Sequence, residues 1–189
     1  MPKFFVTQDK ISDNQIIIDS EDVTHISRVL RLEKGDNVTV CDGQGTDYDA
    51  QIDTIEPKKI LLNIVSRQKS ETEPNIKVTL FQALPKASKM EYIIQKTTEL
   101  GISEIVPVKL SRCVVKIDNK KDEKKKIDRW QKIAESAAKQ SGRGIVPTVS
   151  EFMTINEVIE KSKEFDLFFV PYECEEQKIL KEILTSKSD

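Results

Sequence analysis

The stretch QALPKASKMEYIIQKTTELG, residues 82–101, decides the fold of this chain. Its first residues continue an apolar run that begins at Val78, which is typical of a buried strand, and a proline ends that run. Apolar side chains then recur with helical spacing, which predicts a helix over 88–100. Gly101 predicts the helix end, because glycine readily adopts the left-handed backbone of a C-cap. The apolar face of this helix holds Met90, Ile93, Ile94, Thr97 and Leu100.

Strand and helix patterns continue to alternate after this turn. The predicted elements are strand 77–84, helix 88–100, strand 104–108, helix 122–141, helix 154–163, strand 166–170 and helix 175–185. Such alternation predicts an α/β domain with a parallel sheet and right-handed crossovers. Ligands of such sheets bind beyond the carboxyl ends of the strands.

The first third of the chain has a different, mainly β pattern. Short strands are predicted at 4–7, 15–19, 37–41, 48–55 and 59–65, with one helix at 20–30. Short strands with regular turns indicate a small β-barrel. A polar stretch without periodicity follows and ends in Pro74, which is typical of a linker. We therefore predict a barrel over 1–67, a linker over 68–75 and an α/β domain over 76–189.

Composition gives little sign of a partner. The 189 residues carry 30 Lys and Arg against 32 Asp and Glu, so any RNA affinity requires a local basic face. The three cysteines lie far apart and match no metal-binding spacing, which predicts reduced thiols and no metal. No signal-peptide core or membrane-spanning apolar run occurs, so we expect a cytoplasmic protein without a membrane partner.

Basic residues gather at two places where a ligand could bind. Lys86 and Lys89 lie at the strand-to-helix turn, either as phosphate contacts or as part of an ordinary solvated helix face. Arg28 and Arg31 lie three apart on one predicted helical face and are candidate phosphate contacts. His25, the one histidine, fits a structural role better than a catalytic one.

Further candidates follow predicted helix and strand ends. Gln140 and Arg143 come at the end of helix 122–141, where we expect the forked Arg143 guanidinium to project toward a phosphate or a base edge. Arg112 follows strand 104–108 and is a candidate ligand. Tyr172 follows strand 166–170, and both stacking on a planar ligand and a plain loop role stay open.

The order of these motifs along the chain resembles the RsmE family, bacterial methyltransferases of small-subunit ribosomal RNA. The matching pieces are HISRVLR at 25–31, KGD at 34–36, QALPKASKME at 82–91, QKTTELG at 95–101, RCVV at 112–115, Arg129-Trp130, AAKQSGR at 137–143 and Pro147. Glycine-rich nucleotide-binding motifs, a P-loop and a GxSxG turn do not occur, which weakens other enzyme classes.

The resemblance implies a PUA-like RNA-binding barrel joined to a SPOUT domain, and a homodimer. It also implies S-adenosylmethionine as methyl donor and N3 of a uridine in 16S rRNA of the small ribosomal subunit as acceptor. In that picture Arg28, Arg31, Lys86, Lys89, Arg112, Gln140 and Arg143 contact RNA, and Tyr172 and Glu173 border the cofactor pocket.

One departure from the family pattern changes the expected activity. The family's cofactor-binding knot uses a Gly-Pro-Glu-Gly-Gly segment and a later Leu-Gly…Arg-Ile-Leu-Arg…Glu-Thr-Ala segment, and neither occurs in these 189 residues. The catalytic residue is expected in the same missing part. We therefore expect these residues to bind S-adenosylmethionine poorly, and a non-catalytic RNA-binding module is the alternative function.

Overall fold

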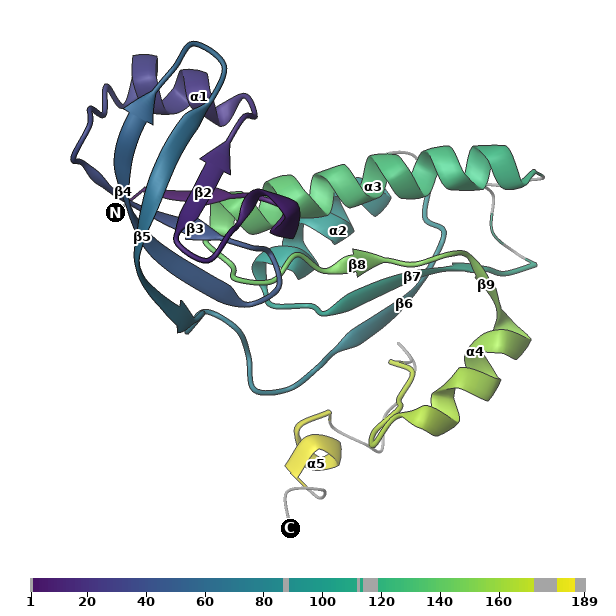
Figure 1. The fold of residues 1–189 in the computed structure, drawn as a ribbon. Helices are drawn as coiled ribbons and strands as arrows, with labels where there is room; N and C mark the ends of the chain where they lie inside the picture. The colour runs from purple at the N-terminus through teal and green to yellow at the C-terminus, as the bar shows by residue number, and fades with distance from the viewer. Residues whose placement is uncertain (1, 87–88, 112, 114–118, 172–179, 186–189) are drawn as a thin grey trace. The chain divides into compact units, whose positions relative to one another are not determined.

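The computed structural model describes residues 2–86, 89–111, 113, 119–171 and 180–185. Met1–Ile155 form one compact unit and Asn156–Asp189 form another. The first unit contains two separate β-sheets, one from each pattern in the sequence (Figure 1).

The first sheet has five strands in the order β1-β3-β4-β5-β2. Their bounds are β1 Lys3–Phe5, β2 Gln15–Ile18, β3 Asn37–Cys41, β4 Thr46–Ile55 and β5 Ile60–Lys69, with a 3₁₀ turn η1 at Gln8–Lys10. β1 runs parallel to β3, and the remaining pairs are antiparallel. Two register shifts in the pairing of β4 with β5 mark bulges, which bend a sheet toward a half-barrel.

A short helical segment packs against the apolar side of this half-barrel. It consists of α1 (Asp22–Thr24) and a π-helical turn η2 (His25–Val29). Val23 and Ile26 are buried with the apolar residues of the strands, whereas the rest of the helical surface is mostly exposed. The predicted helix at 20–30 is confirmed, and its π-helical turn is a feature that the pattern did not indicate.

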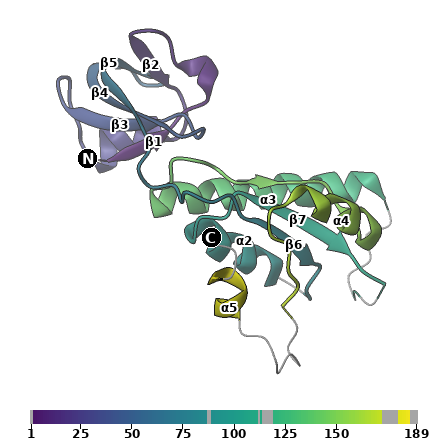
Figure 2. The same cartoon turned by 90° about the horizontal axis from the view of Figure 1, so that it is seen from below.

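The second sheet is parallel and carries the predicted strand–helix alternation. β6 (Thr79–Ala83), β7 (Glu104–Lys109) and β8 (Thr148–Val149) lie in that order, and β9 (Met153–Thr154) also pairs with β7. Helices α2 (Lys89–Glu99) and α3 (Lys120–Ser141) connect these strands and run along the sheet (Figure 1 and Figure 2). The α/β class predicted from the sequence is confirmed.

The core of this part lies between α2, α3 and the sheet. Ile94, Ile105, Trp130 and Ala134 are buried together in this core. The amide of Asp122 donates to the Asn119 side chain at the start of α3, at 2.8 Å. Gly142 ends the helix with a φ of 71°, as expected for a glycine C-cap.

Three details differ from the sequence prediction. Leu100 is 85% exposed, because α2 ends at Glu99 and the next residue leaves the apolar face. Residues 68 and 69 belong to β5, because strand pairing with β4 continues into the polar stretch predicted as a linker. Residues 166–170 are not a strand. A short apolar run indicates a buried strand only where a neighbouring strand pairs with it, and Val170 is exposed.

The second unit contains most of α4 (Ile155–Lys161), the 3₁₀ turn η3 (Ser162–Glu164) and α5 (Leu180–Thr185). Among the described residues, no helix is both long enough and apolar enough to cross a membrane.

Candidate nucleic-acid interface

The two barrel arginines lie on an exposed turn that follows the π-helix. Arg28 is the fourth residue of η2, and Arg31 follows the helix C-cap, so the two do not share a helical face as predicted. The helix ends before it reaches Arg31. Its last hydrogen bond runs from the amide of Leu30, the C-cap, to the carbonyl of His25. Both arginines are exposed, and among the residues that the structure describes neither guanidinium has a hydrogen-bond or ion-pair partner.

Local packing explains the shape of this turn. Ile26 is buried in the half-barrel core, and Leu32 packs against the same core from the other end of the turn. The Leu32 amide donates to the Ile26 carbonyl at 3.0 Å, which closes the turn. Arg31, between these anchors, takes a φ of 54°, a left-handed conformation that is uncommon for a side chain with a Cβ.

A second basic position lies at the carboxyl end of β6. Lys86 and Lys89 are exposed on either side of the strand-to-helix turn. In the described part of the chain neither ammonium group has an ion-pair partner, whereas Lys96 further along α2 pairs with Glu99 at 2.7 Å. The two turn lysines are therefore available to an anionic ligand.

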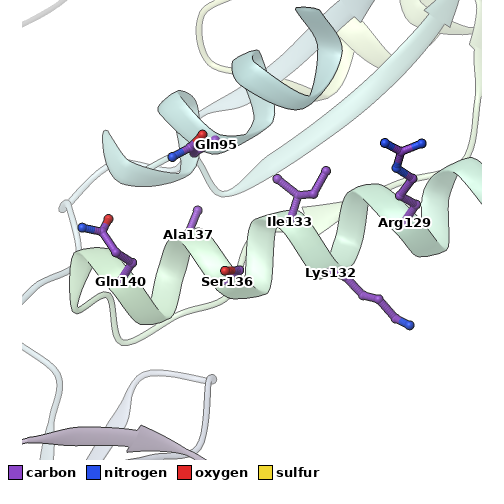
Figure 3. Close-up of a pocket in the computed structure, with 7 residues that line it drawn as sticks. All are labelled: Gln95, Arg129, Lys132, Ile133, Ser136, Ala137 and Gln140. Atoms are coloured by element: carbon purple, nitrogen blue, oxygen red, sulfur yellow. The ribbon is translucent and has the colours of Figure 1, made fainter. Parts of the chain in front are cut away.

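A groove between α2 and α3 contains one of the predicted residues, Gln140. This helix groove has a volume of about 460 Å³ and is lined by Gln95, Arg129, Lys132, Ile133, Ser136, Ala137 and Gln140 (Figure 3). Ile133 and Ala137 point toward α2 and form an apolar floor, while Lys132 points away from α2 at the outer rim.

One cation of the helix groove is already neutralised. Nη2 of Arg129 lies 2.7 Å from Oε1 of Glu91, so this pair joins α3 to α2. Lys132 and Gln140 have exposed side chains without such a partner among the described residues. The sequence placed Arg129 and Gln140 on one predicted helix and Gln95 on another, and the packing of α2 against α3 brings Gln95 to the other two.

Arg143 does not project toward a ligand as the sequence predicted. Its side chain is only 4% exposed, because Glu73 binds it from the stretch that follows β5. Nη1 donates to the backbone carbonyls of Thr98 and Ile102, at 3.3 and 2.6 Å. The donors of Arg143 are therefore used inside the protein.

Glu73 is the residue that sequence reasoning missed. Burial acts to raise the pKa of its carboxyl group, but hydrogen bonds from the Arg143 guanidinium and from the amides of Ile145 and Gly144 outweigh burial and lower that pKa. The sequence shows it as one acidic residue in a polar stretch, and no signal there points to a partner seventy positions away. Arg112, Tyr172 and Glu173, the other predicted site residues, lie outside the described residues.

Both parts of the chain are similar to known protein families. A family model described as an RNA methyltransferase domain matches residues 72–189, and one described as an RNA methyltransferase PUA domain matches residues 18–65. The ribosomal RNA small subunit methyltransferase E of Bacillus subtilis is 35% identical over 176 residues, which cover 92% of this chain and 68% of that protein. The chain belongs to the RsmE family.

Other members of the RsmE family are longer than the region they share with this chain. The Synechocystis methyltransferase E is 35% identical over 160 residues, covering 84% of this chain and 50% of that protein. A crystal structure of the Neisseria gonorrhoeae methyltransferase E bound to S-adenosyl methionine matches with a TM-score of 0.72 and 30% identity, over 85% of this chain and 65% of that one.

The described residues do not form a site that fits the cofactor bound in that crystal structure. S-adenosylmethionine needs an apolar slot for adenine and converging polar groups for its ribose and amino-acid ends. The helix groove has an apolar floor made only of Ile133 and Ala137, and it is open to the solvent along its side. The smaller depression near Glu73 is lined by Glu71, Glu99 and Arg143. The donors of Arg143 already bind Ile102 and Glu73, so they are not available to a ligand.

Proposed function

We propose that this chain takes part in methylation of N3 of a uridine in the 16S RNA of the small ribosomal subunit, with S-adenosylmethionine as donor. Membership in the RsmE family supports the reaction class, and the names of the Bacillus and Synechocystis relatives support the RNA. The observation that carries the proposal is a pair of exposed arginines, Arg28 and Arg31, within the region that matches a PUA model. Neither has a partner among the residues that the structure describes.

The chemistry of the acceptor defines what the RNA-binding residues must do. N3 of uracil carries a proton and lies on the base-pairing edge, so the base must be unpaired or turned out of a helix. The methyl group is transferred in line, so that precise placement of the base supplies much of the rate. The N3 proton must also leave to a base or to water.

The described residues of the chain can supply the positioning part of this work. Arg28 and Arg31 would hold the RNA backbone on the half-barrel. Lys86 and Lys89, at the carboxyl end of β6, would neutralise phosphates next to the α/β sheet. Gln140 would hydrogen-bond a base edge from the helix groove. Arg112 is proposed as a further RNA contact, and Tyr172 and Glu173 as the border of a cofactor pocket.

We also propose a division of labour between the two parts. Residues 1–67 would bind RNA, residues 76–189 would belong to the methyltransferase part, and residues 68–75 would join them. The matches of the two family models at 18–65 and 72–189 support this division. A homodimer in the cytoplasm, where ribosomal RNA is found, completes the proposal.

A second function follows from the cofactor fit. Because the described residues present cations to RNA but do not form a site for S-adenosylmethionine, the chain could act as an RNA-binding module without methyl transfer. The distinction between the two functions is therefore whether the donor binds to this chain.

The deciding experiment incubates the purified chain with unmethylated small subunits and S-adenosylmethionine that carries a labelled methyl group. Labelled N3-methyluridine in the 16S RNA is the expected result for the enzyme. Binding of 16S RNA fragments that weakens with salt, without incorporation and without calorimetric binding of the donor, would establish the RNA-binding module. Absence of both RNA binding and methyl transfer would contradict the two functions together.

A further inference from the structure

Two aliphatic side chains between Arg28 and Arg31 are exposed to solvent. Residues 28–31 read Arg-Val-Leu-Arg. Val29 is 67% exposed and Leu30 is 38% exposed, although the same short helix buries Val23 and Ile26 almost completely. The turn thus presents apolar side chains to the solvent, with a guanidinium group on each side.

The backbone of this turn is not in a relaxed conformation. Its last helical bond spans five residues, from the Leu30 amide to the His25 carbonyl, in place of the usual four. In the described part of the chain Arg31 is the only residue other than glycine with a positive φ. Left-handed backbone at such a residue costs free energy, and strained positions of this kind cluster at ligand-binding sites. Glycine would hold the same φ at a lower cost.

The charges around the turn favour a polyanionic partner. Arg28 and Arg31 are unpaired in the described structure, whereas Asp22, the acidic residue of α1, already binds Lys139 at 3.2 Å. A protein partner would have to bring its own carboxylates to both arginines. An RNA strand brings phosphates at regular intervals, and unstacked bases offer apolar faces between them.

We infer that Val29 and Leu30 form an apolar wedge that packs against unstacked bases, while Arg28 and Arg31 hold the phosphates on either side. The inference rests on the proposed RNA binding and adds the structure that is recognised: a strand with unpaired bases in preference to a continuous duplex. In a duplex the base faces are covered by stacking, and an apolar side chain reaches them only at the free-energy cost of unstacking, so that the phosphate contacts dominate.

Binding to two RNAs of equal length and charge tests the wedge. One is a fully paired duplex, and the other carries an internal loop of unpaired nucleotides. The full-length chain should bind the looped RNA more tightly. Replacing both aliphatic residues, Val29→Ser with Leu30→Ser, should weaken binding to the looped RNA about tenfold, with little change for the duplex and no change in salt dependence.

The matched control is Arg28→Ala, which removes a charge and leaves the wedge. It should weaken binding to both RNAs alike and should reduce the slope of log affinity against log salt by about 0.7 to 0.9. Equal binding of the two RNAs by the unmodified chain would overturn the wedge and leave RNA binding intact. Absence of RNA binding would overturn the proposed function as well. If the serine variant changes only self-association in sedimentation, the patch is a protein contact and the inference is wrong.

Measuring both stability and RNA binding of Arg31 variants shows whether the strained backbone serves RNA binding. Arg31→Gly should raise the melting temperature by a few degrees, because glycine relieves the positive φ, and should still bind looped RNA several-fold more weakly. Arg31→Lys keeps the strain and the charge and should leave the melting temperature unchanged. A glycine variant that binds looped RNA as tightly as the unmodified chain would show that Arg31 has no part in the contact.

Discussion

The carboxylate of Glu73 lies 2.5 Å from Nη2 of Arg143, and this ion pair is almost completely enclosed. The same carboxylate accepts hydrogen bonds from the amides of Gly144 and Ile145, at 2.8 and 2.9 Å. Arg143 in turn donates to carbonyls at the end of α2 and just after it. One acidic residue after β5 therefore joins three segments: its own, the C-terminal end of α2 and the chain that leaves α3.

Removing the charge of Glu73 should destabilise the protein strongly. Glu73→Gln leaves the guanidinium of Arg143 buried without a counter-charge, which costs about 3 kcal/mol in comparable buried pairs. Urea unfolding should show this loss. The control is Glu99→Gln, which breaks the half-exposed pair with Lys96 and should leave the free energy of unfolding almost unchanged. Equal losses for the two variants would contradict a special role for the buried pair.

The stabilisation by Glu73 should also depend on pH. Because the folded protein lowers the pKa of this carboxyl group from its ordinary value of 4.5, the unfolded chain takes up the proton first as the pH falls. The contribution is complete above the unfolded value and is lost as the pH falls through the lowered, folded value. The difference in unfolding free energy between the unmodified protein and Glu73→Gln should be constant above about pH 6 and shrink below about pH 4. A difference that grows on acidification would contradict the assigned direction.

Gly144 should not tolerate a side chain, because a Cβ there would collide with the side chain of Ser70. A Cβ at this position would lie 2.1 Å from Oγ and 2.2 Å from Cβ of Ser70. Gly144→Ala should therefore cost about 2–3 kcal/mol in urea unfolding, the range of an overpacked core. Gly142→Ala is the control, because its Cβ would meet nothing within 4 Å and only its φ of 71° is unfavourable, at about 1 kcal/mol.

A second substitution tests the cause assigned to Gly144. Ser70→Gly removes both atoms that the new Cβ would meet, so Gly144→Ala should cost much less in that background. The four proteins of this cycle give the coupling between the two positions directly. A cost that is the same with and without the Ser70 side chain would place the strain elsewhere.

The sequence predicted those elements whose signals are local. α3 could be predicted because apolar residues repeat with helical spacing up to Ala138 and Gly142 supplies the C-cap. The five strands of the first sheet, and β6 and β7 of the second, were predicted to within a few residues, since each is an apolar run between turn residues. The two-residue strands β8 and β9 were not predicted, because so short a strand carries no period of its own. The class of the protein followed from the order of several motifs along the chain, which the family models then confirmed.

The sequence could not predict features that depend on distant pairing. Arg143 follows a helix end and has the pattern of an exposed ligand, but its burial depends on Glu73, seventy positions earlier. The π-helical turn leaves Arg28 and Arg31 on different faces, because the anchoring of Leu32 in the core decides where the helix ends. Residues 166–170 have the composition of a strand, but a strand exists only when another strand pairs with it. In each of these cases the local sequence was interpreted correctly, and the error came from a contact with a residue or strand far away in the sequence.

The helix groove should contribute to RNA binding through one charge and one amide. Lys132→Ala should reduce the slope of log affinity against log salt by about 0.7 to 0.9, because it removes a single phosphate contact. Gln140→Ala should weaken binding without changing the slope, since an uncharged hydrogen bond releases no counterion. Fluorescence anisotropy with a 16S RNA fragment at several salt concentrations measures both quantities. Lys58→Ala, in the exposed turn between β4 and β5, is the charge-matched control and should change neither. If Lys132→Ala and Lys58→Ala shift the slope equally, the groove has no specific part in binding and the basic residues act only through overall charge.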